Sequence, residues 1–138
     1  MDSRQSHLKS IRPEILSTTI NDSMSADERF QNLVLRPIIK FQNDLLVAVF
    51  KNYIQKHKLV FYDLSIEKRI DYIENAVQKD MKLRNSMKGM IIGLFTVEDY
   101  EIYIQNSSAL NKRMMNIVKQ RLISHIQMFE RPELLAVV

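Results

Sequence analysis

With 138 residues, 46% of them hydrophobic and 26% charged, the chain has the balance of one globular domain, which excludes bulk disorder. The absence of cysteine excludes disulfides and thiolate-ligated metals, and the presence of only two glycines argues against β-rich folds and glycine-rich phosphate loops. A net charge of +4 is too small to indicate nucleic-acid binding by itself. Together these features predict long helices joined by few connections.

The first 24 residues are predicted to form a short helix, which starts or breaks at Pro13, followed by a polar linker. Residues 1–9 lack the apolar core of a signal peptide. The longest apolar run, residues 45–50, is far too short to span a membrane. We therefore expect a soluble, cytoplasmic protein.

A helical bundle domain is predicted over residues 25–131, and it opens with a long helix over residues 25–57. Ser25, followed three residues later by Glu28, is a capping-box pattern, and apolar residues then recur at helical spacing. Pro37 has no amide hydrogen to donate, which predicts a kink at that residue. Residues 45–50 are apolar on every face of the helix, which predicts that this stretch is buried all round.

A second helix is predicted to begin after Ser65 and to end at Gly93. Its apolar stripe runs from Ile66 to Ile91, and Ser65 is a good N-cap residue. Gly89 and Gly93 also match the small-xxx-small pattern of closely approaching helices, but an incidental glycine followed by a helix-ending glycine is the favoured interpretation.

A third helix is predicted to start at a capping box formed by Thr96 and Asp99. It extends to about residue 129, with a break expected over residues 106–108. Pro132 ends it and leaves an apolar tail over residues 132–138.

These elements predict an all-α fold, an up-and-down bundle of four to five helices whose first long helix is kinked at Pro37. A straight helix over residues 25–57 would be about 50 Å long, which exceeds the roughly 37 Å diameter of a compact domain of this size. Burial of Leu46, Val47 and Phe50 on several faces of one helix also requires more cover than a small bundle gives. Both points favour a homodimer.

No metal or cofactor site is predicted. The three histidines, His7, His57 and His125, have no other histidine or glutamate three or four residues away, which is the spacing that helical metal sites need. Ser65 and Lys68 have the Ser-x-x-Lys spacing of some serine acyltransferases, but the N-cap role explains Ser65 better.

No catalytic constellation is visible in the sequence. An enzyme would need polar side chains that converge inside the bundle, whereas a binding module would show an exposed apolar groove. The candidates on the predicted helix faces are Asp44, Tyr53, Asp80, Arg84 and Asn111. Each of them is more readily explained as exposed or as structurally paired.

Two basic stretches, residues 79–88 and 112–121, have the composition of a phosphate-binding face. Asp80 lies four residues before Arg84 and offsets its charge, and no aromatic residue lies among the cations to stack on bases. We therefore expect solvated helix faces and only weak binding to nucleic acid. The residues that would contact nucleic acid are Lys82, Lys88, Lys112, Arg113 and Lys119.

Three strings resemble a small uncharacterised bacterial family of helical proteins: RPIIK at residues 36–40, FKNY at residues 50–53 and NSSALNKRM at residues 106–114. The resemblance covers about residues 25–130. Some members of that family carry the label glyoxalase, which implies a small-molecule enzyme, and the family supplies no catalytic residue to transfer. The strands and the His-x-His-x-Asp-His string of known glyoxalase types are not visible in this sequence.

The leading prediction is therefore a non-enzymatic helical interaction or oligomerisation module. The alternative is a small-molecule enzyme or ligand-binding bundle, a glyoxalase by family label only. The third prediction is a protein that associates weakly with nucleic acid.

Overall fold

The computed structural model describes residues 3–12 and 20–131 of the chain. About 80% of these residues are helical, and none of them lies in a strand, which confirms the all-α prediction. The elements are α1 (Ser3–Ile11), α2 (Ala26–Phe30), the π-helix η1 (Gln31–Leu35), α3 (Arg36–Phe41), α4 (Asn43–Lys56), the 3-10 helix η2 (Val60–Asp63), α5 (Ile66–Lys79), α6 (Met81–Ile92), α7 (Val97–Tyr103), α8 (Ser107–Ser124) and the 3-10 helix η3 (Ile126–Met128).

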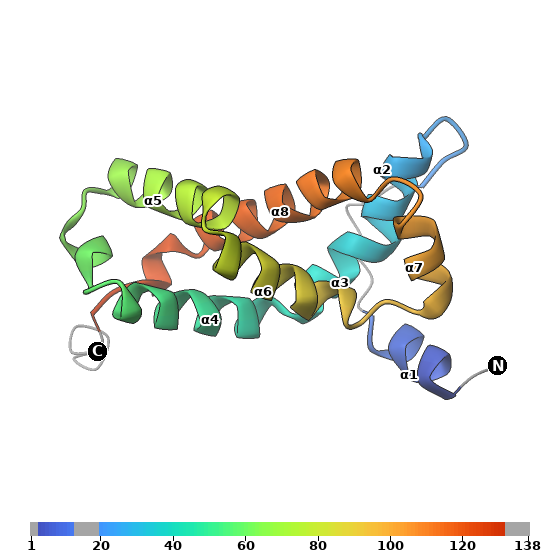
Figure 1. Cartoon of the computed structure of the whole chain (residues 1–138), viewed down its shortest axis with the longest axis horizontal. Helices are drawn as coiled ribbons and strands as arrows, with labels where there is room; N and C mark the ends of the chain where they lie inside the picture. Colours follow the sequence, from blue (N-terminus) through green and yellow to red (C-terminus); the bar gives the residue numbers. More distant parts are fainter. Residues whose placement is uncertain (1–2, 13–19, 132–138) are drawn as a thin grey trace.

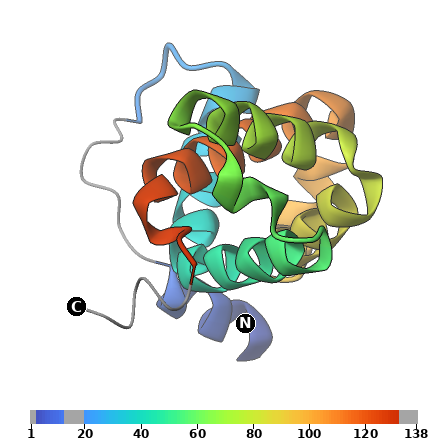
Figure 2. The same cartoon turned by 90° about the vertical axis from the view of Figure 1, so that its left-hand side faces the viewer.

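Helix α8 holds the bundle together. It packs against η1, α3 and α4 on one side and against α5 and α6 on the other. Figures 1 and 2 show α1, α2 and α7 gathered at one end of the molecule, and the connection between α4 and α5 at the other end. The two sides of α8 are therefore lined by different parts of the chain.

The segment predicted as one helix over residues 25–57 is helical almost throughout, but its regular α-geometry is lost twice. Ser25 caps it as predicted, because its side chain accepts a hydrogen bond from the Glu28 amide. The π-helix η1 comes just before Pro37, and Gln42, with φ −85° and ψ 3°, separates α3 from α4. The chain changes direction between α3 and α4 (Figure 1). Regular geometry is thus lost on both sides of Pro37 rather than at the proline itself.

The prediction of one helix over residues 65–92 is wrong, because the chain leaves helical geometry at Asp80. Asp80 has extended backbone angles, and its Oδ1 accepts hydrogen bonds from the amides of Lys82 and Leu83 at 3.1 and 3.3 Å. A carboxylate in this position satisfies amides that have no partner within the new helix. The predicted single helix is therefore two helices, α5 and α6. For this reason the described residues form more and shorter helices than the four to five that the sequence predicts.

The remaining caps follow the sequence closely. The Ser65 side chain accepts a hydrogen bond from the Lys68 amide and starts α5, and Thr96 and Asp99 form the predicted capping box of α7. The expected break near residues 106–108 lies between α7 and α8. Gly93 caps α6 with right-handed backbone angles. The predictions for Pro13 and for residues 132–138 lie outside the described residues.

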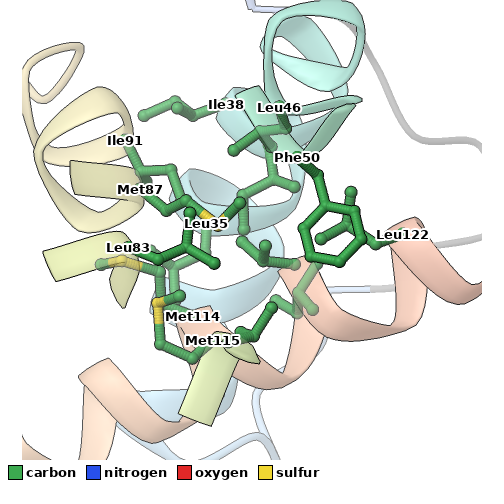
Figure 3. Close-up of a cluster of buried hydrophobic side chains, with 14 of the residues drawn as sticks. Leu35, Ile38, Leu46, Phe50, Leu83, Met87, Ile91, Met114, Met115 and Leu122 are labelled. Atoms are coloured by element: carbon green, nitrogen blue, oxygen red, sulfur yellow. The ribbon is translucent and has the colours of Figure 1, made fainter. Parts of the chain in front are cut away.

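The core contains buried side chains from α2 to α8, including those of η1 and η2, and Figure 3 shows the part where η1, α3, α4, α6 and α8 meet. Leu46, Val47 and Phe50 are buried within a single chain, so their burial needs no second copy, and that argument for a homodimer fails. Leu45 is 51% exposed, so residues 45–50 are not buried all round as predicted. Met87 fills core space as expected of a flexible apolar side chain.

Two features at the end near the α4–α5 connection are important for stability. The Phe50 ring contacts four other aromatic rings there, those of Tyr53, Phe61, Tyr72 and Phe129. The connection itself contains Lys58 and Leu59, both with left-handed backbone at φ 64° and 60°. Neither glycine of the chain has a positive φ.

Two arginines, the half-buried Arg12 and the buried Arg69, attach outlying segments to the bundle. Arg12 forms an ion pair with Asp99 and donates a hydrogen bond to the Leu94 carbonyl, which attaches the end of α1 to α7. Arg69 in α5 is 7% exposed and forms an ion pair with Glu130, which lies after α8. A buried guanidinium requires such partners, because burial of an unpaired charge is very costly.

Candidate functional site

The structure brings only two of the five catalytic candidates together. The Tyr53 hydroxyl donates a hydrogen bond of 2.9 Å to the Asp80 carboxylate. Asn111 instead accepts a hydrogen bond from the Tyr103 hydroxyl at 2.6 Å, and Asp44 is exposed. Arg84 makes no side-chain hydrogen bond or ion pair with any residue in the described part of the chain.

The pKa shifts of Tyr53 and Asp80 indicate that their hydrogen bond is structural. The hydrogen bond from Tyr53 is the main cause that lowers the pKa of Asp80, and the Leu83 and Lys82 amides act in the same direction. Burial is the main cause that raises the pKa of Tyr53, and Asp80 raises it further. Tyr53 therefore stays protonated and Asp80 ionised, so neither group is prepared to exchange a proton near neutral pH.

This contact changes the charge balance around Arg84. The sequence predicts that Asp80 offsets Arg84, but the Asp80 carboxylate instead faces Tyr53 and the first amides of α6. No carboxylate of residues 3–12 and 20–131 forms an ion pair with Arg84, so its charge has no carboxylate partner in this part of the chain.

Arg84 lines a pocket of about 310 Å³ where α5, α6 and α8 meet. Gln78 comes from the last turn of α5, Arg84 from the first turn of α6, and the other lining residues from α8. The pocket is lined by Gln78, Arg84, Lys112, Met115 and Asn116. Two cations and two amides thus surround the buried side chain of Met115, and none of these described lining residues is acidic.

The lining residues of this pocket indicate which chemical groups it can bind. A guanidinium and an ammonium supply hydrogen-bond donors with full positive charge, and the two side-chain amides add neutral donors and acceptors. This combination favours a phosphate or carboxylate group. The volume lies at the lower end of the range found for small-molecule sites.

The five predicted nucleic-acid contacts are divided between two helices. Lys82 and Lys88 lie on α6, and Lys112, Arg113 and Lys119 lie on α8. Because α6 packs against α8, the two basic stretches are neighbours in the fold. Arg113, however, points to the other side of α8, where its Nη1 donates a hydrogen bond of 3.1 Å to Gln31.

The histidines remain apart from this pocket. The His57 ring stacks on Tyr53 at 4.0 Å between ring centroids, and His125 lies 3.0 Å from the side-chain oxygen of Asn43. His7 is exposed on α1. In residues 3–12 and 20–131, no three His, Cys, Asp or Glu side chains are grouped so that they could hold a metal ion.

A second pocket, of about 330 Å³, lies beside α7 and has a mostly apolar lining that includes Ile92, Phe95 and Tyr100. It offers fewer polar groups to orient a ligand than the pocket around Arg84. We therefore take the pocket between α5, α6 and α8 as the candidate site and call it the basic pocket.

Comparisons with protein-family models, curated proteins and solved structures found no significant match. The resemblance to a bacterial helical family therefore stays a prediction. None of the described helices combines the length and the apolar character needed to cross a lipid bilayer.

Sequence reasoning identified Arg84 and Lys112 but missed Gln78, Met115 and Asn116. The helix break at Asp80 is the sequence feature that could have identified Gln78. Only this break places the end of α5 and the start of α6 beside the same pocket. Asp80 has a good N-cap side chain, but it also fits the (i, i+4) pairing of a continuous helix, so the pattern allowed both interpretations.

Proposed function

We propose that the protein is a non-catalytic binding module whose basic pocket takes the phosphate or carboxylate group of a small molecule. The observation that carries the proposal is the convergence of Arg84 and Lys112 in one pocket while Asp80 is held elsewhere. Two cations close together repel each other, and a bound anion relieves that repulsion.

The exposed position of the pocket supports weak affinity. Lys112 is exposed and Arg84 is half-buried, so water competes with the ligand for both. Charge-assisted hydrogen bonds contribute about 1.5–3 kcal/mol each, and less where water competes. Two of them supply at most about 3–6 kcal/mol before the cost of association, so we expect a dissociation constant of about millimolar or weaker for a single phosphate.

The enzymatic alternative has less support. Asp80 caps α6, and its hydrogen bond with Tyr53 connects this cap to α4. The lining of the basic pocket contains no side chain that acts as a base or nucleophile near neutral pH. No residue that lines this pocket therefore supports the glyoxalase activity that the family resemblance implies.

Inorganic phosphate is the probe that tests the proposal. Titration at low ionic strength, followed by amide NMR shifts, is expected to show saturable binding centred on residues 78–84 and 112–116. Arg84→Gln and Lys112→Gln are each expected to weaken binding about tenfold, which corresponds to about 1.4 kcal/mol.

Lys68→Gln provides the matched control, because Lys68 is an exposed cation at the opposite end of α5 and the substitution removes the same charge. It should leave phosphate binding within about twofold of the wild type. Equal weakening by Lys68→Gln and Arg84→Gln, or no saturable shift, would show that the pocket does not select anions.

We also propose a homodimer, on grounds other than the burial of Leu46, Val47 and Phe50. Phe41 and Leu45 are four residues apart and about half exposed on α3 and α4, and paired exposed apolar side chains favour association. Light scattering is expected to give about twice the chain mass of 16.3 kDa. Phe41→Glu should return the protein to the monomer mass, and a wild-type monomer at micromolar concentration would refute the dimer.

A further inference from the structure

The side of α8 that faces away from the basic pocket carries arginines whose side chains are hydrogen-bonded to side-chain amides instead of carboxylates. Arg113 donates to the Gln31 side-chain oxygen and Arg121 to the Asn43 side-chain oxygen, both at 3.1 Å. Arg36 on α3 donates to the Asn32 side-chain oxygen, also at 3.1 Å. We call Arg36, Arg113 and Arg121 the arginine row.

The amide partners orient the guanidinium groups without neutralising them. None of the three arginines forms an ion pair with a residue in the described ranges. Burial lowers the pKa of Arg121, and the positive charge of Arg36 lowers it further. Arginine nevertheless stays charged in proteins, so the row keeps its three positive charges.

The row and the basic pocket border one exposed face of α8. Lys112 and Lys119 lie along the edge nearest α6, and Arg113 and Arg121 lie along the other edge. Between them are Asn116, Gln120 and Ser124, all exposed and polar. Residues 107–124 include no acidic side chain. The exposed side chains of this face are therefore cations and neutral hydrogen-bonding groups, while Ile123 on the same face is half-buried and packs against the core.

We propose that this face of α8 binds the phosphodiester backbone of a nucleic-acid duplex, with one phosphate seated in the basic pocket. The inference rests on the proposed function, because it uses the same pocket for one of the phosphates. Arg, Lys, Asn, Gln and Ser are the side chains that contact phosphates in such complexes.

Charge density favours a phosphodiester backbone over an acidic protein helix. The stretch from Lys112 to Arg121 covers about 14 Å of helix axis, and a duplex carries about eight phosphate charges in the same length of its own axis when both strands are counted. An acidic helix presents about one carboxylate per 5.4 Å turn on the facing side. It would also need exposed apolar residues in the middle of the face for packing, and the exposed residues there, Asn116, Gln120 and Ser124, are polar.

The composition of the face also favours a duplex over a single strand. Single-stranded nucleic acid is held largely by bases that stack on aromatic side chains. No aromatic residue occurs in α8. A duplex exposes its backbone with the bases paired, and sequence-independent contacts to phosphates suffice for binding.

Fluorescence anisotropy with a duplex of about 20 base pairs tests the inference through the salt dependence of binding. The wild type is expected to show a slope of log K against log salt of about −4, from four to five neutralised phosphates. The dissociation constant at physiological salt should be no tighter than about 10⁻⁶ M. Arg113→Gln/Arg121→Gln is expected to reduce the slope by about 2.

Lys51→Gln/Lys56→Gln is the matched control, because it removes two charges from α4 on another part of the surface. It should leave the slope unchanged, whereas an equal change would mean that net charge alone drives binding and would overturn the inference.

Lys119→Gln covers the case in which the double arginine variant fails to fold, since Lys119 makes no hydrogen bond or ion pair with a described residue. It should reduce the slope by about 1, and an unchanged slope would count against the inference.

Two comparisons separate this inference from the proposed function. Phosphate binding that depends on Arg84, together with duplex binding unaffected by Arg113→Gln/Arg121→Gln, would overturn the inference and leave the proposed function standing. Duplex binding that depends on the arginine row, with no phosphate binding in the pocket, would overturn the proposed function. Polyglutamate of matched charge should bind more weakly than the duplex, and equal binding would overturn the assignment to a phosphodiester backbone.

Discussion

Phe50→Ala is expected to lower the free energy of unfolding by about 3–5 kcal/mol, the range for truncation of a fully buried phenylalanine. Phe50 is completely buried, and its ring contacts four other aromatic rings. Alanine removes those contacts and leaves a cavity that the surrounding helices fill only in part. Urea denaturation followed by circular dichroism measures the change.

Tyr100→Ala is the matched control, because it truncates an aromatic ring to alanine at a residue that is 46% exposed. We expect it to cost about 1 kcal/mol or less, since little apolar surface is lost from the core. Similar costs for the two variants would mean that the aromatic cluster around Phe50 is not a principal source of stability.

Arg69→Met is expected to cost about 3 kcal/mol, because it removes the donor for several buried acceptors at once. Arg69 donates to the carbonyls of Leu64 and Tyr62 at 3.1 and 2.9 Å and pairs with Glu130 at 2.6 Å. Its guanidinium also lies 5.1 Å from the centre of the Phe61 ring. Methionine keeps much of the volume but leaves these acceptors unpaired, and urea denaturation reports the loss.

Arg131→Met removes the arginine from an exposed ion pair with Asp63 and is the control for Arg69→Met. Exposed pairs contribute about 0–1 kcal/mol, so we expect a small effect. A large effect at Arg131, or a small one at Arg69, would contradict the importance that we assign to burial of the guanidinium.

The helix starts could be predicted because capping is a local property of the sequence. Ser25, Ser65 and Thr96 each stand three residues before the amide that their side chain accepts from, and all three predictions are confirmed. The loss of helical geometry at Gln42 has no comparable local signal, because glutamine fits a helix interior well. Packing of α3 and α4 against α8 is a property of the whole fold and cannot be read from neighbouring residues.

The candidate site was predictable only in part. Arg84 and Lys112 stand out as members of basic stretches, but their convergence depends on how α5, α6 and α8 pack. The pairing of Arg113 with Gln31 and of Arg121 with Asn43 joins residues about 80 positions apart. Neither amide has a sequence pattern that distinguishes it from any other exposed glutamine or asparagine.

The left-handed backbone of Lys58 and Leu59 has a consequence for how the chain folds. A left-handed residue other than glycine costs roughly 1–2 kcal/mol, and it persists only where the surrounding structure compensates that cost. Part of the compensation is local, because the Leu59 amide donates a hydrogen bond of 3.1 Å to the Ile54 carbonyl at the end of α4. Phe61, two residues further along, adds contacts with Phe50 and Phe129. A partly folded chain without these ring contacts has only the local bond to hold the two residues in this conformation. The aromatic cluster and the reversal between α4 and α5 therefore form and dissolve together, as one cooperative unit.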